Sequence, residues 1–337
     1  MISIEEVREV HLELSTNCNA SCPLCPRNYF GYPHNAGYPD AELSIDNIKT
    51  IFSPEFVAQL RLIRFNGNLG DFMLARDGLA IAAYFRQHNP TARIDISTNG
   101  GARNNQFWTD LAQSVPIVRF ALDGLDDTHH LYRQNTQFQT VLKNAKSFID
   151  AGGIASWKMI LFDHNQHQVE AARTMSQELG FADFELVEHG RDDGPVFDKN
   201  GTLTHTIGSR WPKPQEDVVF YKKRQEYYGS KKMYLNEISD PVAINCVTKG
   251  PRKTIYIAAN GEVYPCCWTG FYPRTFDPNL HYGIDRIKEL LGSFDNNALH
   301  RPLEECLSWF NKIEQAHANK SCQQGLPFIC SRECGQR

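Results

Sequence analysis

Residues 9–25 read EVHLELSTNCNASCPLC, a short strand pattern that runs directly into three closely spaced cysteines. Apolar and polar residues alternate from Val10 to Leu14, which is the period of a β-strand with one buried face. Cys18, Cys22 and Cys25 follow on a loop at the carboxyl end of that strand. This stretch therefore joins the start of a sheet to a candidate metal-binding loop.

The chemistry of this loop depends on the gaps of three and two residues between its thiols. Three thiolates can hold three irons of a cubane [4Fe–4S] cluster and leave the fourth iron open to a substrate. A zinc site, the alternative, would need a fourth ligand, for which His34 is the nearby candidate. Simple packed thiols are the other alternative. An open iron on a low-potential cluster is what one-electron cleavage of a bound ligand requires.

Composition and charge disfavour a nucleic-acid-binding protein and a membrane protein. The chain has 337 residues and a formal net charge of −4, which disfavours nucleic acid as a partner. Met1 to Val10 are charged and polar rather than signal-like, and apolar runs such as Leu79–Phe85 are too short to span a bilayer. We expect a cytoplasmic protein with no membrane partner. Its ten cysteines should stay reduced, which favours metal over disulfides.

Further strand patterns follow the first at the spacing of a βα repeat. They are expected over Leu62–Phe65, Ala92–Ser97, Ile117–Leu122, Lys158–Phe162 and Phe184–Val187. Helical patterns lie between them; one starts at an N-cap, Ser44, and two stop at the glycines Gly152 and Gly180. Six such units predict an α/β fold, a parallel sheet curled into a partial (β/α)6 TIM-type barrel. The cysteine loop lies at a carboxyl strand end, where active sites of such sheets lie.

The pattern changes near residue 190, which suggests three parts. Residues 1–190 form the predicted barrel core, 191–245 a linker or an inserted lobe close to the substrate, and 246–337 a cysteine-rich extension. In that extension, Asn260-Gly261 between apolar runs predicts a β-hairpin with a two-residue turn.

Taken with the fold pattern, the N-terminal cysteine motif resembles that of the radical S-adenosylmethionine (SAM) superfamily. Its signature is C-x3-C-x2-C after the first strand, here Cys18, Cys22 and Cys25. The resemblance covers about residues 8–188. It implies a partial (β/α)6 barrel, a [4Fe–4S] cluster held by these three cysteines, and SAM bound at the open iron.

The resemblance also implies residues of the SAM pocket. Gly70-Asp71 matches a Gly-Gly-Glu segment that binds the methionine amino group, with Asp in place of Glu. Asn99 and Asp123 end the third and fourth strands in motifs that resemble those lining the pocket, and Arg133 matches an arginine that faces the SAM carboxylate. The alternatives are a turn with a helix N-cap at Asp71, plain turns after Asn99 and Asp123, and a surface ion pair at Arg133.

The C-terminal cysteines resemble those of the SPASM and twitch extensions of this superfamily. The ligand set implied for one auxiliary [4Fe–4S] cluster is Cys246, Cys266, Cys330 and Cys334, with Cys322 as the replacement for one of them. A structural zinc site with four cysteine ligands is the alternative. Cys267 and Cys306 are expected to be packed thiols.

These features together predict an oxidoreductase-like radical SAM enzyme. It would cleave SAM to a 5′-deoxyadenosyl radical that removes a hydrogen atom from a small-molecule or peptide substrate. An external one-electron reductant such as flavodoxin or ferredoxin would supply the electron. The second hypothesis is a non-catalytic, metal-stabilised binding or electron-transfer protein. No motif names the substrate.

Overall fold

The chain divides into two compact units. The computed structural model describes residues 2–25, 27–29, 32–33, 40–188, 194–208, 243–271, 294–317, 320–321, 324, 326, 330 and 334–336. Unit 1 consists of Met1–His11, Lys49–Leu60 and Pro214–Arg337, and unit 2 of Leu12–Ile48 and Arg61–Lys213. Unit 2 holds the N-terminal cysteines and the strands expected from residue 62 to residue 187.

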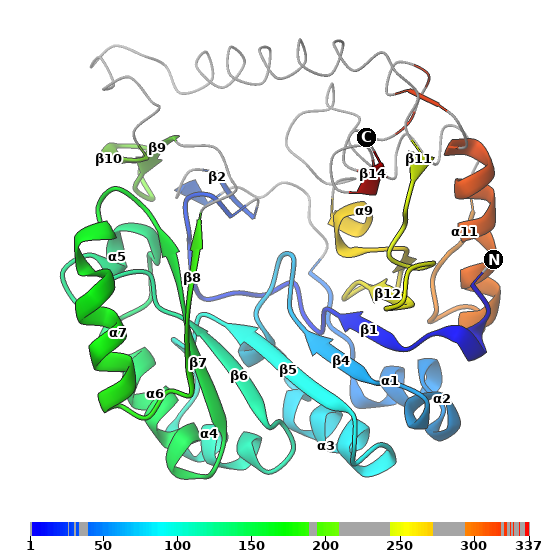
Figure 1. The fold of residues 1–337 in the computed structure, drawn as a ribbon, viewed down its shortest axis with the longest axis horizontal. Helices are drawn as coiled ribbons and strands as arrows, with labels where there is room; N and C mark the ends of the chain where they lie inside the picture. Colours follow the sequence, from blue (N-terminus) through cyan, green and yellow to red (C-terminus); the bar gives the residue numbers. More distant parts are fainter. Residues whose placement is uncertain are drawn as a thin grey trace. The chain divides into compact units, whose positions relative to one another are not determined.

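Parallel strands form the sheet of unit 2 (Figure 1). In chain order they are β4 (Leu62–Phe65), β5 (Arg93–Thr98), β6 (Ile117–Ala121), β7 (Ile154–Leu161) and β8 (Asp183–Glu188). Each pairs with the next along the chain. Parallel neighbours need a crossover connection, so this order confirms the predicted succession of βα units.

Helices supply those crossovers. They are α3 (Gly78–His88), α4 (Asn105–Ala112), α6 (Phe138–Asp150) and α7 (Val169–Glu178), with α5 (His129–Tyr132), η2 (Phe72–Leu74) and η3 (Gln166–Gln168) as shorter turns. Gly152 and Gly180 follow α6 and α7 with φ of +91° and +83°, as expected where a chain leaves a helix in the left-handed region. The predicted N-cap is also present, since Ser44 Oγ accepts the amide of Asn47 at 3.1 Å as α1 (Ile45–Ile51) begins.

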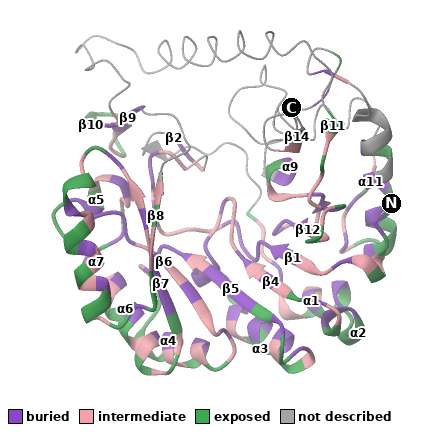
Figure 2. Ribbon diagram, viewed as in Figure 1, coloured by how far each residue is buried: buried purple, intermediate pink, exposed green. Residues whose placement is uncertain are grey.

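Aromatic side chains join these helices to one face of the sheet. Phe120 on β6 lies 5.1 Å from Trp108 of α4 and 6.2 Å from Phe148 of α6, measured between ring centroids. Trp157 on β7 contacts Phe138 of α6 at 6.0 Å. Figure 2 shows buried segments interleaved with intermediate ones along the strands, as in the alternating burial of β4 and β6. Alternation with period two therefore sends one side of each strand into this core.

Unit 1 contains a β-hairpin, β12 (Thr254–Ile257) and β13 (Val263–Tyr264). Its other elements are η1 (Ile4–Glu6), α2 (Pro54–Ala58), α9 (Cys267–Phe271), α11 (Leu303–His317), and the paired strands β11 (Ala243–Ile244) and β14 (Gly335–Gln336). The first residues of β1 (Glu9–Leu12) lie beside β12, where the amide of Glu9 donates to the carbonyl of Lys253 at 3.4 Å.

The hairpin is confirmed, but its predicted two-residue turn is wrong. The amide of Ala258 donates to the carbonyl of Glu262 at 2.9 Å, so three residues lie between the closing pair. A two-residue type I′ turn needs two consecutive residues at positive φ. Of Asn260 and Gly261, Gly261 alone has positive φ, at +86°, which suits a three-residue loop.

Some bounds differ from those expected. β7 begins at Ile154, earlier than the predicted Lys158, because Ala155 and Ser156 gave no strand signal. Two short hairpins were not expected, β2 (Asn28–Tyr29) with β3 (Tyr32–Pro33), and β9 (Gly194–Phe197) with β10 (Leu203–Ile207).

Unit 2 runs on to Lys213, so it includes the β9–β10 hairpin. The three-part division at residues 190 and 245 stays a prediction. Within the described residues, no helix has the length and apolar character that crossing a membrane would demand.

Candidate functional site

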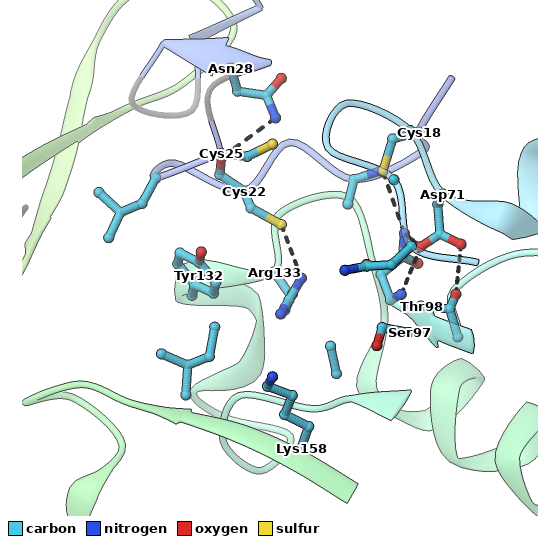
Figure 3. Close-up of a pocket in the computed structure, with 18 of the residues that line it drawn as sticks. Cys18, Cys22, Cys25, Asn28, Asp71, Ser97, Thr98, Tyr132, Arg133 and Lys158 are labelled. Atoms are coloured by element: carbon cyan, nitrogen blue, oxygen red, sulfur yellow. Dashed lines mark hydrogen bonds between the residues drawn. The ribbon is translucent and has the colours of Figure 1, made fainter. Parts of the chain in front are cut away.

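A cavity of about 330 Å³ opens in unit 2 at the carboxyl ends of the strands (Figure 3). Its volume is within the range of pockets for small ligands. The three motif cysteines lie along one rim. The residues that line it are Cys18, Ala20, Cys22, Leu24, Cys25, Asn28, Asn66, Gly67, Asn68, Leu69, Gly70, Asp71, Ser97, Thr98, Asn99, Ala121, Tyr132, Arg133, Lys158, Ile160, Phe162 and Val187.

Local hydrogen bonds shape the cysteine loop. The amide of Cys25 donates to the carbonyl of Cys22 at 3.0 Å, and the amide of Asn28 donates to the carbonyl of Cys25 at 2.8 Å. These successive turns allow the thiols of a short segment to face the same cavity. Arg27 donates to the carbonyl of Thr16, which ties the loop to the segment that precedes it.

Burial raises the pKa of the Cys18 and Cys22 thiols. At Cys22 a nearby cation opposes this effect, because Arg133 Nη1 lies 3.6 Å from the sulfur and lowers the thiol pKa. At Cys18 the nearby carboxyl of Asp71 adds to the rise in pKa. Metal ligation requires thiolates, so loading this loop with metal would release protons.

An apolar shell surrounds the cysteine loop. Val196 of β9 and Ile207 of β10, both fully buried, pack in one cluster with Ala20, Tyr132 and Phe162. The cysteine side chains contact this cluster. The unexpected β9–β10 hairpin thus supplies part of the apolar packing around the cysteine loop.

The segment 66–71 is held against the end of the first strand. Glu13 Oε1 accepts the amides of Leu69 and Gly70 at 2.7 and 3.0 Å, and Glu13 is 2% exposed. A Cβ on Gly70 would lie 1.8 Å from the carbonyl oxygen of Ser15, so only glycine fits there. This close approach brings Gly70 and Asp71 to the cavity wall.

Asp71 is buried and its carboxylate is fully engaged. Oδ1 accepts the Thr98 hydroxyl at 2.7 Å and the Met73 amide at 3.1 Å. Oδ2 accepts the backbone and side-chain N–H groups of Asn99 at 2.8 and 2.9 Å. Asp71 is therefore the N-cap of η2 and also ties β5 to the loop after β4. Burial raises its pKa, against these hydrogen bonds.

Asn99 connects Asp71 to the cysteine loop. Its Nδ2 donates to Asn19 Oδ1 at 3.0 Å and lies 3.5 Å from the Cys18 sulfur. The following residue, Gly100, has φ of +67°, which lets the chain turn away from the cavity. Asn99 thus combines the turn expected there with contact to a motif cysteine.

Asp123 and Arg133 form a buried ion pair rather than a surface one. Arg133 Nε donates to Asp123 Oδ2 at 2.6 Å, and Asp123 Oδ1 accepts the amide of Ile160 at 2.5 Å. Asp123 is 0% exposed and is not among the residues that line the cavity. Arg133 does line it. Burial raises the pKa of Asp123, while Arg133 opposes that shift.

Two charged residues of the site were not singled out from the sequence. Glu13 holds the loop after β4, and Lys158 of β7 lines the cavity. Glu13 directly follows β1, between the buried Leu12 and Leu14, and Lys158 lies on β7 between the buried Trp157 and Met159. That alternation was the available signal for a polar face.

In unit 1, four cysteines of the predicted auxiliary set are described. The β11–β14 pairing brings two of them near one another, since the amide of Asn245 donates to the carbonyl of Cys334 at 2.9 Å. Thr248 Oγ1 donates to the Cys246 sulfur at 3.3 Å. Burial raises the pKa of Cys266, and Cys246 adds to that rise. Cys322 and His34 lie outside the described residues.

Within the described part of the chain, no three His, Cys, Asp or Glu side chains converge as they would on a single metal ion. The residues of the N-terminal loop nevertheless suit a larger group. Three thiols of one loop face one cavity, an apolar cluster packs around them, and side-chain N–H groups lie near two of the sulfurs. Thiolate ligands with N–H donors nearby are the usual surroundings of an iron–sulfur cluster.

Comparison with known proteins gave matches among solved structures. Neither a family model nor a curated protein matches the chain. SuiB of Streptococcus suis, bound to S-adenosylmethionine, is 13% identical with a TM-score of 0.54, covering 89% of this chain and 65% of SuiB. A histidine-tagged form of anSMEcpe with bound AdoMet is 13% identical with a TM-score of 0.52, covering 89% of this chain and 77% of that protein.

The chain therefore spans just under two thirds of SuiB, at 65% of its length. At such low identities the likeness concerns the fold. The parallel βα units and the cysteine loop at their carboxyl ends agree with it. The chain therefore shares the fold of these two SAM-bound proteins, a partial TIM-type barrel.

Proposed function

We propose that this protein is a radical SAM enzyme and that the cavity at Cys18, Cys22 and Cys25 is its active site. The observation that carries the proposal is the motif C-x3-C-x2-C on the rim of a cavity at the carboxyl strand ends. When bound there, a [4Fe–4S] cluster would supply the electron that splits SAM into methionine and a 5′-deoxyadenosyl radical. The protein supplies position and exclusion of water.

Several side chains would act on that site through charge and hydrogen bonds. Arg133 places a guanidinium beside the Cys22 sulfur, which favours the thiolate. Asn99 Nδ2 lies 3.5 Å from the Cys18 sulfur, and N–H groups close to cluster sulfurs tune the reduction potential.

Gly70, Asp71, Asn99, Asp123 and Arg133 were predicted to bind SAM, and these roles stay predictions. Four of them, all but Asp123, line the cavity. We assign Asp71 and Asp123 a positioning role, because hydrogen bonds within the protein engage all four of their carboxylate oxygens.

Anaerobic reconstitution tests the central claim. Protein supplied with iron, sulfide and a strong reductant should release 5′-deoxyadenosine and methionine from SAM. Cys22→Ala should abolish this release. Cys306→Ala is the matched control, because Cys306 is buried like Cys22 but does not line the cavity. Stoichiometric zinc without deoxyadenosine would favour the non-catalytic alternative.

We further propose one auxiliary [4Fe–4S] cluster held by Cys246, Cys266, Cys330 and Cys334. Two observations support this proposal. The amide of Asn245, the residue before Cys246, donates to the carbonyl of Cys334, and Cys246 lies close enough to Cys266 to raise the pKa of its thiol. Wild-type protein should bind about eight irons, and Cys266→Ala about four, since each cubane holds four. A wild-type content of about four irons with one zinc would instead indicate a structural zinc site.

The substrate is proposed as a small molecule or a peptide. SuiB has been solved bound to the precursor peptide SuiA, which supports a peptide as one class. Flavodoxin or ferredoxin is the proposed reductant and the cytoplasm the proposed location.

A further inference from the structure

The helix-free face of the sheet is polar in unit 2. Residues that alternate with the buried core positions line the cavity or lie on the same side of the sheet, as Ser97, Ala121 and Lys158 do. Side chains two residues earlier along a strand lie on the same face. On the five strands these are Arg64, Asp95, Arg119, Ser156 and Glu185. The interior of a closed barrel is usually packed with branched apolar residues. Here charged side chains occupy positions that apolar residues would fill in a closed barrel.

These charges form a connected row of ion pairs. Arg64 Nε lies 3.3 Å from Asp95 Oδ1, and Arg119 Nη1 lies 3.2 Å from Asp95 Oδ2. Glu185 is shared by two cations, with Arg119 Nε at 3.8 Å from Oε2 and Lys158 Nζ at 3.6 Å from Oε1. Lys158 belongs to the cavity lining, so the row is continuous with the cavity.

Within the row, as far as the structure describes it, cations outnumber carboxylates. In the row, Arg64, Arg119 and Lys158 stand against Asp95 and Glu185, three against two. Arg93 and Asp183, at the starts of their strands, lie on the same face. With them the count is four cations against three carboxylates. Among the described residues either count leaves one positive charge in excess within the row. At the cavity, Arg133 pairs with Asp123, and the carboxylate of Asp71 is already engaged by four hydrogen bonds within the protein.

Hydrogen bonding on this face is also incomplete. The contacts of Lys158 and Arg119 to Glu185 exceed the 2.7–3.2 Å of a good N–H···O bond. The Arg119 contact to Asp95 Oδ2 is close, yet that oxygen has no aligned donor among the described residues. The side chains of Lys158 and Arg119 are 34% and 23% exposed, so their N–H groups can reach a bound ligand.

We propose that the substrate of this enzyme carries an oxyanion, a carboxylate or a phosphate, which Lys158 and Arg119 bind on the helix-free face of the sheet. The two cations flank one carboxylate, and an oxyanion placed between them would take charge-assisted hydrogen bonds that Glu185 is too distant to make. Figure 3 shows Lys158 across the cavity from the labelled cysteines, which places this oxyanion away from the cluster loop. The inference rests on the proposed function, because it assigns that site its substrate class.

Oxyanion binding can be measured without knowing the substrate. Reconstituted protein is saturated with SAM, so that the SAM carboxylate site is filled, and titrated with acetate or inorganic phosphate at constant ionic strength against chloride. We expect a saturable rise in the melting temperature with at least one of the two. A response to phosphate alone indicates a phosphorylated substrate, and a response to acetate indicates a carboxylate.

Variants locate the site. Lys158→Met and Arg119→Gln should each raise the Kd of the active oxyanion about tenfold, the effect of losing one charge-assisted hydrogen bond. Lys158→Arg should retain binding. Lys146→Met, which removes an exposed helical ion pair with Asp150, is the matched control and should bind as wild type. Lys158 is partly exposed, so its variant should fold even if Arg119→Gln does not.

The inference is overturned if neither oxyanion stabilises SAM-saturated protein beyond chloride, or if Lys158→Met and Arg119→Gln bind as wild type does. Stabilisation by acetate or phosphate that disappears when SAM is present would also overturn the inference. In that case Lys158 and Arg119 would bind the carboxylate of SAM. Deoxyadenosine release, measured on the same wild-type preparation, reports the proposed function separately.

Discussion

Replacing Asp71 with Asn should unfold unit 2 more easily, because its carboxylate accepts four hydrogen bonds in a buried site. Asn keeps the shape but turns one oxygen into an NH₂ group that faces two donors. Hydrogen bonds to a charged acceptor contribute about 1.5–3 kcal/mol each, so losing two lowers the free energy of unfolding by about 3–6 kcal/mol. Burial of the charge opposes folding and raises the pKa of Asp71, which favours the lower end, about 3 kcal/mol.

Urea unfolding followed by tryptophan fluorescence measures this change, since Trp108 and Trp157 are fully buried in unit 2. Asp110→Asn is the control, because Asp110 accepts an exposed contact from Gln106 on a helix surface and should change stability by less than about 0.5 kcal/mol. If Asp71→Asn matched this control in stability but weakened SAM binding, Asp71 would be a SAM ligand rather than a clamp, and the reasoning would be refuted.

Three further perturbations test the surroundings of the cavity. Gly70→Ala places a Cβ 1.8 Å from a backbone oxygen and should lower the free energy of unfolding by about 1–3 kcal/mol, whereas Gly250→Ala, whose Cβ would meet its nearest atom at 3.9 Å, should be neutral in the same urea titration. Arg133→Met leaves the carboxylate of Asp123 buried and unpaired, so a loss of about 3–5 kcal/mol is expected, and adding Asp123→Asn should restore part of it; no restoration would argue against the pair. Burial lowers the pKa of His129 to about 3, with smaller contributions from Arg133 and a neighbouring histidine. Below pH 6.5 the unfolded chain therefore binds a proton that the folded chain does not, and stability falls as the pH falls toward 3. From pH 7 to pH 5 the wild type should lose about 2 kcal/mol more than His129→Gln, and parallel pH profiles would contradict the assignment.

The fold was predictable to the extent that it depends on periodicity. Strands with alternating apolar residues, such as Leu62–Phe65 and Ile117–Ala121, were placed within a residue of their bounds. The β9–β10 hairpin was not expected, because its stability comes from Val196 and Ile207 packing on the cysteine loop rather than from its own pattern. Contacts between residues this far apart leave no local signal.

At the site, the sequence by itself determined that three thiols of one loop lie at the carboxyl end of a strand, because spacing and alternation are local properties. It also placed Gly70, Asp71 and Asn99 after neighbouring strands, where a parallel sheet must bring them together. Only the tertiary structure decided what each side chain does there. Whether a carboxylate is free to bind a ligand depends on which donors the folded chain aims at it, and for Asp71 those donors come from η2 and from the end of β5. The charged row that ends at Lys158 was likewise decided by strand register, which sets cations of one strand against carboxylates of the next.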